Sequence, residues 1–298
     1  MSIRALGQLL GYVWRHPLNG RSGARGRIAA LGRVLRWQLG SRLLPGPFAL
    51  PFVEQTSLLV ERGMTGATGN WYCGLHEVHE MAFVLHALRA DEFFVDVGAN
   101  VGSYTVLAAG AAAARVVAVE PVPRTFDRLR RNVAFNRLEG RVNCHPVGLS
   151  AQEGVLRFSR DLDTVNHVLA DDEKIPAVEV LVATLDALLD GAAPTLLKID
   201  VEGHDLAVLR GARHTLSDRR CLAVIMETNG SGRRYGVSDA DLLAVMREAG
   251  FEPFGYDAFA RRLIPGSAGA NTVFVRDPVR LSERLRTART FRLINGVV

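Results

Sequence analysis

The chain has 298 residues, of which 48% are hydrophobic, so it can bury a complete core and is not intrinsically disordered. No run approaches the ~18 uncharged apolar residues that a transmembrane helix needs. The first apolar stretch lacks a following cleavage site, so we expect neither a membrane span nor a signal peptide. The net charge of +5 is unevenly distributed, and three cysteines without C-x-x-C spacing favour a reduced, cytoplasmic compartment.

The first 53 residues form a basic segment. They contain eight arginines and no acid, and they end in the proline-rich connector "LLPGPFALPF". We predict a largely helical N-terminal arm that carries a cationic stripe of four arginines. These four are Arg27, Arg33, Arg36 and Arg42. We interpret the stripe as the solvated face of an accessory helix. Contact with anionic lipid headgroups is the main alternative, and nucleic acid is a less favoured partner.

Residues 54–278 form the predicted main domain, and residues 279–298 form a C-terminal helix and tail. Short apolar runs alternate with helical patterns along the main domain. The predicted strands are 92–97, 115–120, 141–149, 154–159, 177–183, 195–200, 221–227, 251–256 and 271–277, and the predicted helices are 103–114, 123–136, 205–216 and 239–250. Apolar strands separated by helices indicate a parallel sheet that is covered on both faces. We therefore predict an α/β fold with a doubly wound, mostly parallel Rossmann-like sheet and an N-terminal helical arm.

The stretch "DVGANVGSY" lies at the end of the first strand of this sheet. Ligands bind beyond the carboxyl ends of strands in such folds, and glycine in the turn lets the backbone approach a ligand closely. Glu120 ends the next strand, where a carboxylate accepts the hydroxyl hydrogens of a ribose. We predict a site for an adenosine-type cofactor. Its residues are Asp96, Gly98, Asn100, Gly102, Tyr104 and Glu120.

The glycine spacing distinguishes between two cofactors. A dinucleotide fingerprint requires G-x-G-x-x-G, but the corresponding positions here are Gly98, Asn100 and Ser103. The pattern D-x-G-x-x-x-G, with a carboxylate just before the loop, suits a cationic ligand that carries an amino acid. S-adenosylmethionine meets that requirement, and an NAD-dependent oxidoreductase is the alternative enzyme class.

The stretch "KIDVEGHD" places a lysine, three carboxylates and a histidine at the end of another strand. Asp200 ends this strand, so it is the first choice for the general base or for the residue that positions the acceptor. Glu202 is the second choice. Lys198 lies on the same face of the strand as Asp200 and can keep it ionised. His204 could take a proton near neutral pH, and Asp205 complements the dipole of the following helix.

Other polar residues extend this site. Asp200, Glu202 and Glu227 could together form an oxygen-rich site for a divalent metal such as Mg²⁺. Asn166 and His167 lie in a polar insertion and are candidates for contact with a polyol substrate. Tyr72, His76 and Glu77 are candidates for covering the cofactor. The (D/N)-P-P-(Y/F) turn that is typical of amino-group methylation is missing after "KID", which favours an oxygen acceptor.

Three segments carry a resemblance to a known family. In order and spacing, "FFVDVGANVGSYTVLA", "VVAVEP" and "LLKIDVEGHDLAVLRGA" resemble the FkbM family of S-adenosylmethionine-dependent methyltransferases, and "NWYCGLHEVHEMAF" and "NTVFVRD" extend the similarity. The resemblance implies a class I methyltransferase fold and O-methylation, often of sugars or secondary metabolites. The family motif is similar to K-I-D-V-E-G-x-E, so Asp205 is a shortened version of the last acid and His204 fills a variable position.

These observations predict a methyltransferase that acts on a hydroxyl of a carbohydrate, glycoconjugate or secondary metabolite. A non-catalytic protein that binds a cofactor or docks at a membrane is the third class that the sequence permits. The arginine-rich arm adds the hypothesis of peripheral contact with the inner membrane surface.

Overall fold

The computed structural model describes residues 3–160, 162, 166–170, 173–266 and 270–298. Its centre is an eight-stranded sheet with the order β12-β11-β13-β10-β9-β3-β4-β5. The five parallel strands are β3 (Phe93–Val97), β4 (Arg115–Val119), β5 (Val142–His145), β9 (Leu196–Ile199) and β10 (Ala223–Glu227). The antiparallel strands are β11 (Glu252–Asp257), β12 (Arg262–Pro265) and β13 (Asn271–Val275). The predicted α/β, mostly parallel sheet is confirmed, with an antiparallel edge.

Alternating residues of the parallel strands divide the interior into two cores. On β3, Phe94 packs into one core, whereas Val95 and Val97 pack into the other. This arrangement follows from strand geometry, because successive side chains point to opposite faces of a sheet. Burial on both faces explains why these strands are continuously apolar in the sequence.

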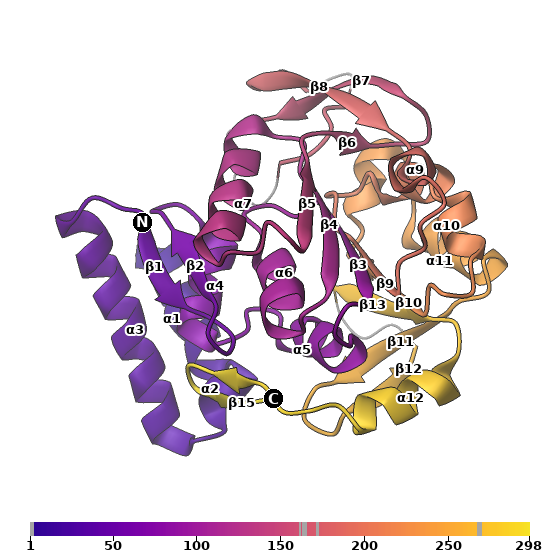
Figure 1. The fold of residues 1–298 in the computed structure, drawn as a ribbon. Helices are drawn as coiled ribbons and strands as arrows, with labels where there is room; N and C mark the ends of the chain where they lie inside the picture. Colours follow the sequence, from indigo (N-terminus) through magenta and orange to yellow (C-terminus); the bar gives the residue numbers. More distant parts are fainter. Residues whose placement is uncertain (1–2, 161, 163–165, 171–172, 267–269) are drawn as a thin grey trace.

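Helices cover both faces of the sheet (Figure 1). One core includes residues of α5 (Val78–Ala87), α6 (Ser103–Val106) with its π-helical continuation Leu107–Ala111, α7 (Pro123–Phe135) and α12 (Pro278–Arg286). The other includes residues of α8 (Leu185–Leu189), α9 (Asp205–Arg210), α10 (Arg213–Ser217) and α11 (Asp239–Glu248). The sheet is therefore the middle layer of three.

The predicted helix over residues 205–216 is wrong in one respect, because it is two helices. The break between α9 and α10 falls at Gly211, where a side chain would overlap the carbonyl oxygen of Ser150. Sequence periodicity continued through this position and gave no sign of the close approach.

The predicted strand over residues 141–149 is wrong in one respect, because its first part is β5 and its end belongs to a separate small sheet. Its strands are β6 (Gly148–Leu149), β7 (Gly154–Ser159) and β8 (Ala177–Ala183), in the order β6-β8-β7. Strand β12, the hairpin of β1 (Phe48–Pro51) and β2 (Ser57–Val60), and a hairpin near the C-terminus were not predicted as strands. A hairpin of β14 (Arg292–Leu293) and β15 (Gly296–Val297) follows α12.

The N-terminal helices are α1 (Ile3–Arg15), α2 (Pro17–Gly20) and α3 (Gly23–Leu43), and α3 forms the outer edge of the molecule (Figure 1). Helix α3 packs on α4 (Thr65–Cys73), and α1 and α2 pack on α3. The proposed domain boundaries at residues 53 and 278 stay predictions. Asn295 of the C-terminal hairpin donates hydrogen bonds to Asn19 Oδ1 and to the Cys73 carbonyl, each over 2.8 Å.

The interpretation of four arginines as one solvated stripe is wrong for Arg33. Its side chain is buried, and its Nη2 donates to the carbonyl oxygen of Tyr72 at 2.7 Å and to Oδ1 of Asn19 at 3.1 Å. Burial lowers the pKa of this guanidinium. Helical-wheel geometry placed Arg33 near Arg36, but the tertiary fold turns it toward α4.

The substitution Arg33→Met is expected to loosen the N-terminal helices. It leaves the buried carbonyl of Tyr72 without its best donor, which costs about 1–3 kcal/mol. Urea unfolding should report that loss, and limited proteolysis should cut within residues 1–47 faster than in the wild type. Arg36→Met is the matched control, because Arg36 is exposed and has no side-chain partner in the described part of the chain. Equal stability and protease sensitivity of both variants would contradict the role assigned to Arg33.

Candidate active site

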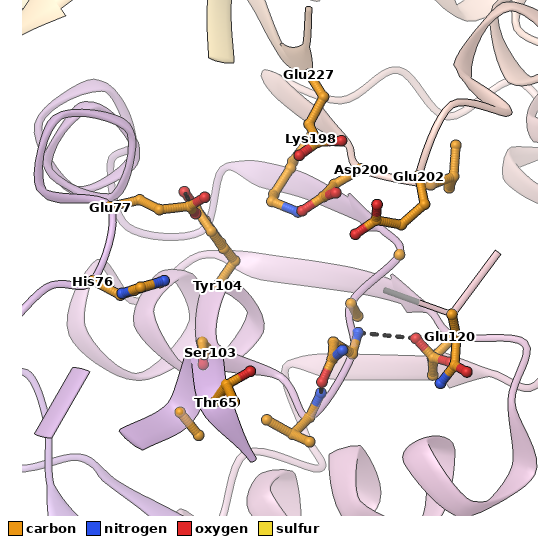
Figure 2. Close-up of a pocket in the computed structure, with 18 of the residues that line it drawn as sticks. Thr65, His76, Glu77, Ser103, Tyr104, Glu120, Lys198, Asp200, Glu202 and Glu227 are labelled. Carbon is orange, nitrogen blue, oxygen red and sulfur yellow. Dashed lines mark hydrogen bonds and ion pairs between the residues drawn. The ribbon is translucent and has the colours of Figure 1, made fainter. Parts of the chain in front are cut away.

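The carboxyl ends of β3, β4, β9 and β10 meet at a cavity of about 280 Å³. Figure 2 shows Lys198, Asp200, Glu202 and Glu227 on one side of it and His76 and Glu77 on another. The lining also includes Gly98, Asn100, Tyr104, Glu120 and Asn166. This is the place in a doubly wound sheet where ligands bind.

The glycine turn after β3 is in direct contact with the loop after β9. Gly98 has a φ of +76°, and a Cβ at this position would overlap the carbonyl oxygen of Asp200. Only glycine satisfies both conditions. The amides of Gly98 and Ala99 both donate to the Val119 carbonyl at 3.0 Å, which ties the turn to β4 as well. The turn therefore brings three strand ends together.

Glu120 is held by two backbone amides. Its Oε2 accepts from the Asn100 amide at 3.0 Å, and its Oε1 accepts from the Val122 amide at 2.9 Å. The side chain is buried, and burial raises its pKa to about 7. Asn100 has a φ of 51°, a left-handed conformation that asparagine tolerates. Each carboxylate oxygen keeps a second lone pair with which it can accept from a ligand hydroxyl.

Lys198 and Asp200 form a short ion pair beside the glycine turn. Lys198 Nζ lies 2.7 Å from Asp200 Oδ2 and 4.8 Å from the centre of the Tyr104 ring. Burial alone would lower the pKa of Lys198, but the carboxylates of Asp200 and Asp96 raise it overall. The lysine thus stays charged although it is only 5% exposed.

Three carboxylates gather next to this pair. One oxygen from each of Asp200, Glu202 and Glu227 lies within 4.8 Å of the others. Burial, followed by repulsion from Asp200, raises the pKa of Glu202 to about 7 and also raises that of Glu227. Such a cluster can share a proton or hold a divalent cation. Binding of Mg²⁺ by these three carboxylates stays a prediction.

Glu202 itself has a strained backbone. Its φ is 55°, in the left-handed region that residues other than glycine and asparagine rarely occupy. Gly203 follows with a φ of +99°, and a Cβ there would lie 2.6 Å from the backbone of Ser231. Strained residues of this kind concentrate at functional sites. The conformation turns the Glu202 side chain into the cavity, where it forms part of the lining.

The opposite wall comes from the segment between α4 and α5. Tyr104 donates from its hydroxyl to Glu77 Oε2 at 2.7 Å, and Asn271 Nδ2 lies 3.3 Å from Glu77 Oε1. The Tyr12 hydroxyl lies 2.7 Å from Nδ1 of His76 and donates to its backbone carbonyl at 2.9 Å. A side chain at Gly69 would overlap the His76 ring, so α4 makes room for this histidine.

Several lining residues were not singled out from the sequence. Thr65 and Gly66 lie at the start of α4, and Asn70 Nδ2 donates to the Ser103 hydroxyl at 3.2 Å. Phe158 comes from the small separate sheet. Tertiary packing brings these positions to the cavity, and no local motif marks them. The start of a helix attracts negatively charged groups in general, and here it lies at the cavity.

Some predicted site residues lie outside the lining. Asp96 is fully buried behind it and accepts from the Thr105 hydroxyl at 2.6 Å. His204 Nε2 lies 3.1 Å from the Ser150 hydroxyl, and the His204 ring packs edge-on against Tyr235. His167 Nε2 lies 3.2 Å from Glu173 Oε1. Their predicted roles, and that of Gly102, stay predictions.

Asp205, the first residue of α9, also lies behind the cavity. Its Oδ2 accepts from the Gly203 amide at 3.1 Å, and burial raises its pKa to about 7. It therefore braces the loop that carries Glu202.

Comparison with known proteins identifies related chains. The hexuronic acid methyltransferase AglP of Haloferax volcanii is 30% identical over 168 residues, which is 56% of this chain and 66% of the relative. Methyltransferase 1 of Beauveria bassiana is 29% identical over 146 residues, which is 41% of this chain and 58% of the relative. The chain thus spans less than two thirds of the length of either relative.

Among solved structures, a TehB-like methyltransferase of Corynebacterium glutamicum aligns with a TM-score of 0.41 at 13% identity, covering 70% of this chain and 94% of that one. The methyltransferase FkbM domain matches residues 96–253, more than half of the 298 residues. This match begins at Asp96 and contains the glycine turn, Glu120 and the Lys198–Glu202 loop. The chain therefore belongs to the FkbM methyltransferase family.

Proposed function

We propose that this protein transfers the methyl group of S-adenosylmethionine to a hydroxyl of a carbohydrate, glycoconjugate or secondary metabolite. The observation that carries the proposal is the contact between Gly98 and the Asp200 carbonyl. It supports the proposal because the two loops touch, and Glu120, which we predict to bind the ribose, lines the same cavity as the carboxylates after β9. Membership in a methyltransferase family argues against the nicotinamide-dependent alternative.

The cofactor would lie across the ends of β3 and β4. Glu120 would accept from the ribose hydroxyls, because its carboxylate lies in the cavity lining with lone pairs to spare. Thr65 and Gly66 line the cavity at the start of α4, so the positive end of this helix would face the methionine carboxylate. S-adenosylmethionine supplies an electrophilic methyl group on a sulfonium centre.

Methyl transfer requires alignment and the removal of one proton. The new O–CH₃ bond forms as the S–CH₃ bond breaks, the sulfur departs as a neutral thioether, and the hydroxyl proton passes to a base. Holding the reactants in line supplies ~7–11 kcal/mol of the barrier reduction in favourable cases. Glu202 is the better base, because a pKa of about 7 suits proton transfer near neutral pH. Asp200, paired with Lys198, would position the acceptor.

The carbohydrate class has one independent support. The relative from Haloferax volcanii bears the name hexuronic acid methyltransferase, and the cavity opens among carboxylates and amides that can bond to hydroxyls. Asn166, from the segment after β7, is part of the lining and would contact such a substrate. A divalent metal at Asp200, Glu202 and Glu227 is the alternative: it would lower the pKa of the acceptor hydroxyl, and Glu202 would then be a metal ligand instead of the base.

We also propose that the N-terminal helices bring the protein to the inner, anionic surface of a membrane. None of the helices in the described part of the chain combines the length and apolar character needed to cross a bilayer. Residues 1–53 carry eight positive charges and no negative one. All three cysteines are free thiols, as is usual in a reduced, cytoplasmic compartment.

Substitution of Glu120 tests the placement of the cofactor. Glu120→Ala removes the acceptor of the ribose hydroxyls, so calorimetric titration should give an S-adenosylmethionine Kd about tenfold to a hundredfold higher than wild type. Glu120→Gln keeps the shape of the turn and should also bind more weakly. Glu139→Ala, at an exposed position, is the control. Wild-type affinity in Glu120→Ala would mean that the ribose lies elsewhere.

The pH dependence of turnover tests the role of Glu202. A base works only when deprotonated, so the release of S-adenosylhomocysteine with a methyl glucuronide acceptor should rise as the pH increases through about 7. Glu202→Gln should lower kcat by about 10²–10⁴-fold and remove this rise, with cofactor affinity unchanged. Glu179→Gln, on the exposed side of β8, is the control. An unaltered pH profile in Glu202→Gln would assign the base to another residue.

A further inference from the structure

Helix α3 exposes large apolar side chains to solvent. Ile28, Leu35, Leu39 and Leu43 are 63%, 60%, 54% and 78% exposed. At about 100° per residue they fall within about a quarter of the helix circumference, so they form one continuous ridge. We call these four residues the α3 ridge. Charged or polar residues normally occupy the outer face of a surface helix.

The inner face of α3 is also occupied. Ala30, Arg33, Val34 and Trp37 are buried against the rest of the protein. The α3 ridge therefore points away from the body, along the outer edge of the molecule (Figure 1). Rotation of the helix cannot bury it without exposing Trp37 and breaking the Arg33 hydrogen bonds.

Helix α1 adds a second row of exposed apolar residues. Leu6, Leu10 and Trp14 recur every four residues and are 37%, 36% and 42% exposed. The guanidinium of Arg27 lies 5.5 Å from the centre of the Trp14 ring, so the exposed sides of α1 and α3 adjoin at this point. Tryptophan is typical of the boundary between a membrane and water.

Positive charge surrounds the α3 ridge. Arg25, Arg36 and Arg42 are exposed on the same helix, and the first acid of the chain is Glu54. A second copy of the chain would bring its own arginines against these, which disfavours self-association. An anionic lipid surface instead supplies both an apolar layer and the opposite charge.

We propose that α3 lies in the plane of an anionic bilayer, with the α3 ridge inserted at the boundary between headgroups and acyl chains. This inference rests on the membrane contact proposed above and adds that leucine insertion, rather than arginine charge alone, holds the protein there. Trp14 and the exposed arginines occupy the headgroup layer. Methyl transfer would then act on acceptors carried at that surface.

Vesicle co-sedimentation of the full chain tests the inference. Wild type should bind vesicles of phosphatidylcholine with phosphatidylglycerol, and the triple variant Leu35→Gln, Leu39→Gln, Leu43→Gln should bind at least about tenfold more weakly because less apolar area enters the membrane. Leu181→Gln is the matched control, since Leu181 is 67% exposed on β8, away from the arm. Thermal unfolding and S-adenosylmethionine binding establish that each variant is folded.

The other outcomes separate the proposals. Wild-type binding by the triple variant, together with loss of binding in Arg36→Gln, Arg42→Gln, would overturn leucine insertion and leave a purely electrostatic contact. Absence of wild-type binding to these vesicles would overturn both membrane proposals. A change in elution volume on gel filtration in the triple variant, without any change in vesicle binding, would assign the α3 ridge to self-association. Cofactor binding is independent of all three results, so the methyltransferase proposal is judged separately.

Discussion

The contact between Gly98 and the carbonyl of Asp200 is the constraint on which the site depends. A single side-chain carbon at Gly98 would force the two loops apart. The β3 loop reaches Glu120 through the amide of Asn100, and the β9 loop carries Asp200 and Glu202. Because the loops touch, the group that would bind the cofactor and the groups that would bind the acceptor share one rigid wall. Positioning, the main requirement of methyl transfer, is thereby built into the backbone.

Charge in the cavity wall is balanced through one lysine. Lys198 is buried at the end of β9, where an unpaired ammonium would be costly, and Asp200 satisfies it at 2.7 Å. Two further carboxylates, Glu202 and Glu227, lie close enough to Asp200 that their pKa values rise. One positive charge cannot neutralise three negative ones, so the cluster holds a proton near neutral pH. A site in this state can accept or release a proton with little change in structure.

Local sequence predicted the parts of the fold that local physics determines. The sequence runs that form β3, β4, β9 and β10 are apolar because both faces of these strands are buried. Glu120 was identified from its position in the sequence, at the end of the predicted strand that follows the glycine turn. The contribution of α4, the inward turn of Arg33 and the break at Gly211 arise from contacts between distant segments. No periodicity records such contacts. The same holds for α3, where the sequence suggested a cationic stripe, whereas the structure buries Arg33 and exposes a row of leucines.

The bridge between Tyr104, Glu77 and Asn271 has a consequence for how the protein can be divided. The family match covers residues 96–253, yet Glu77 precedes that segment and Asn271 follows it. Tyr12, which supports His76, lies further still toward the N-terminus. A fragment with residues 96–253 alone would lack His76 and Glu77, so the glycine turn and the carboxylates would be open to solvent on that side of the cavity. The structural unit that encloses the candidate site is thus larger than the stretch by which relatives are recognised, because the N-terminal flank lines the cavity and Asn271 of the C-terminal flank supports that lining.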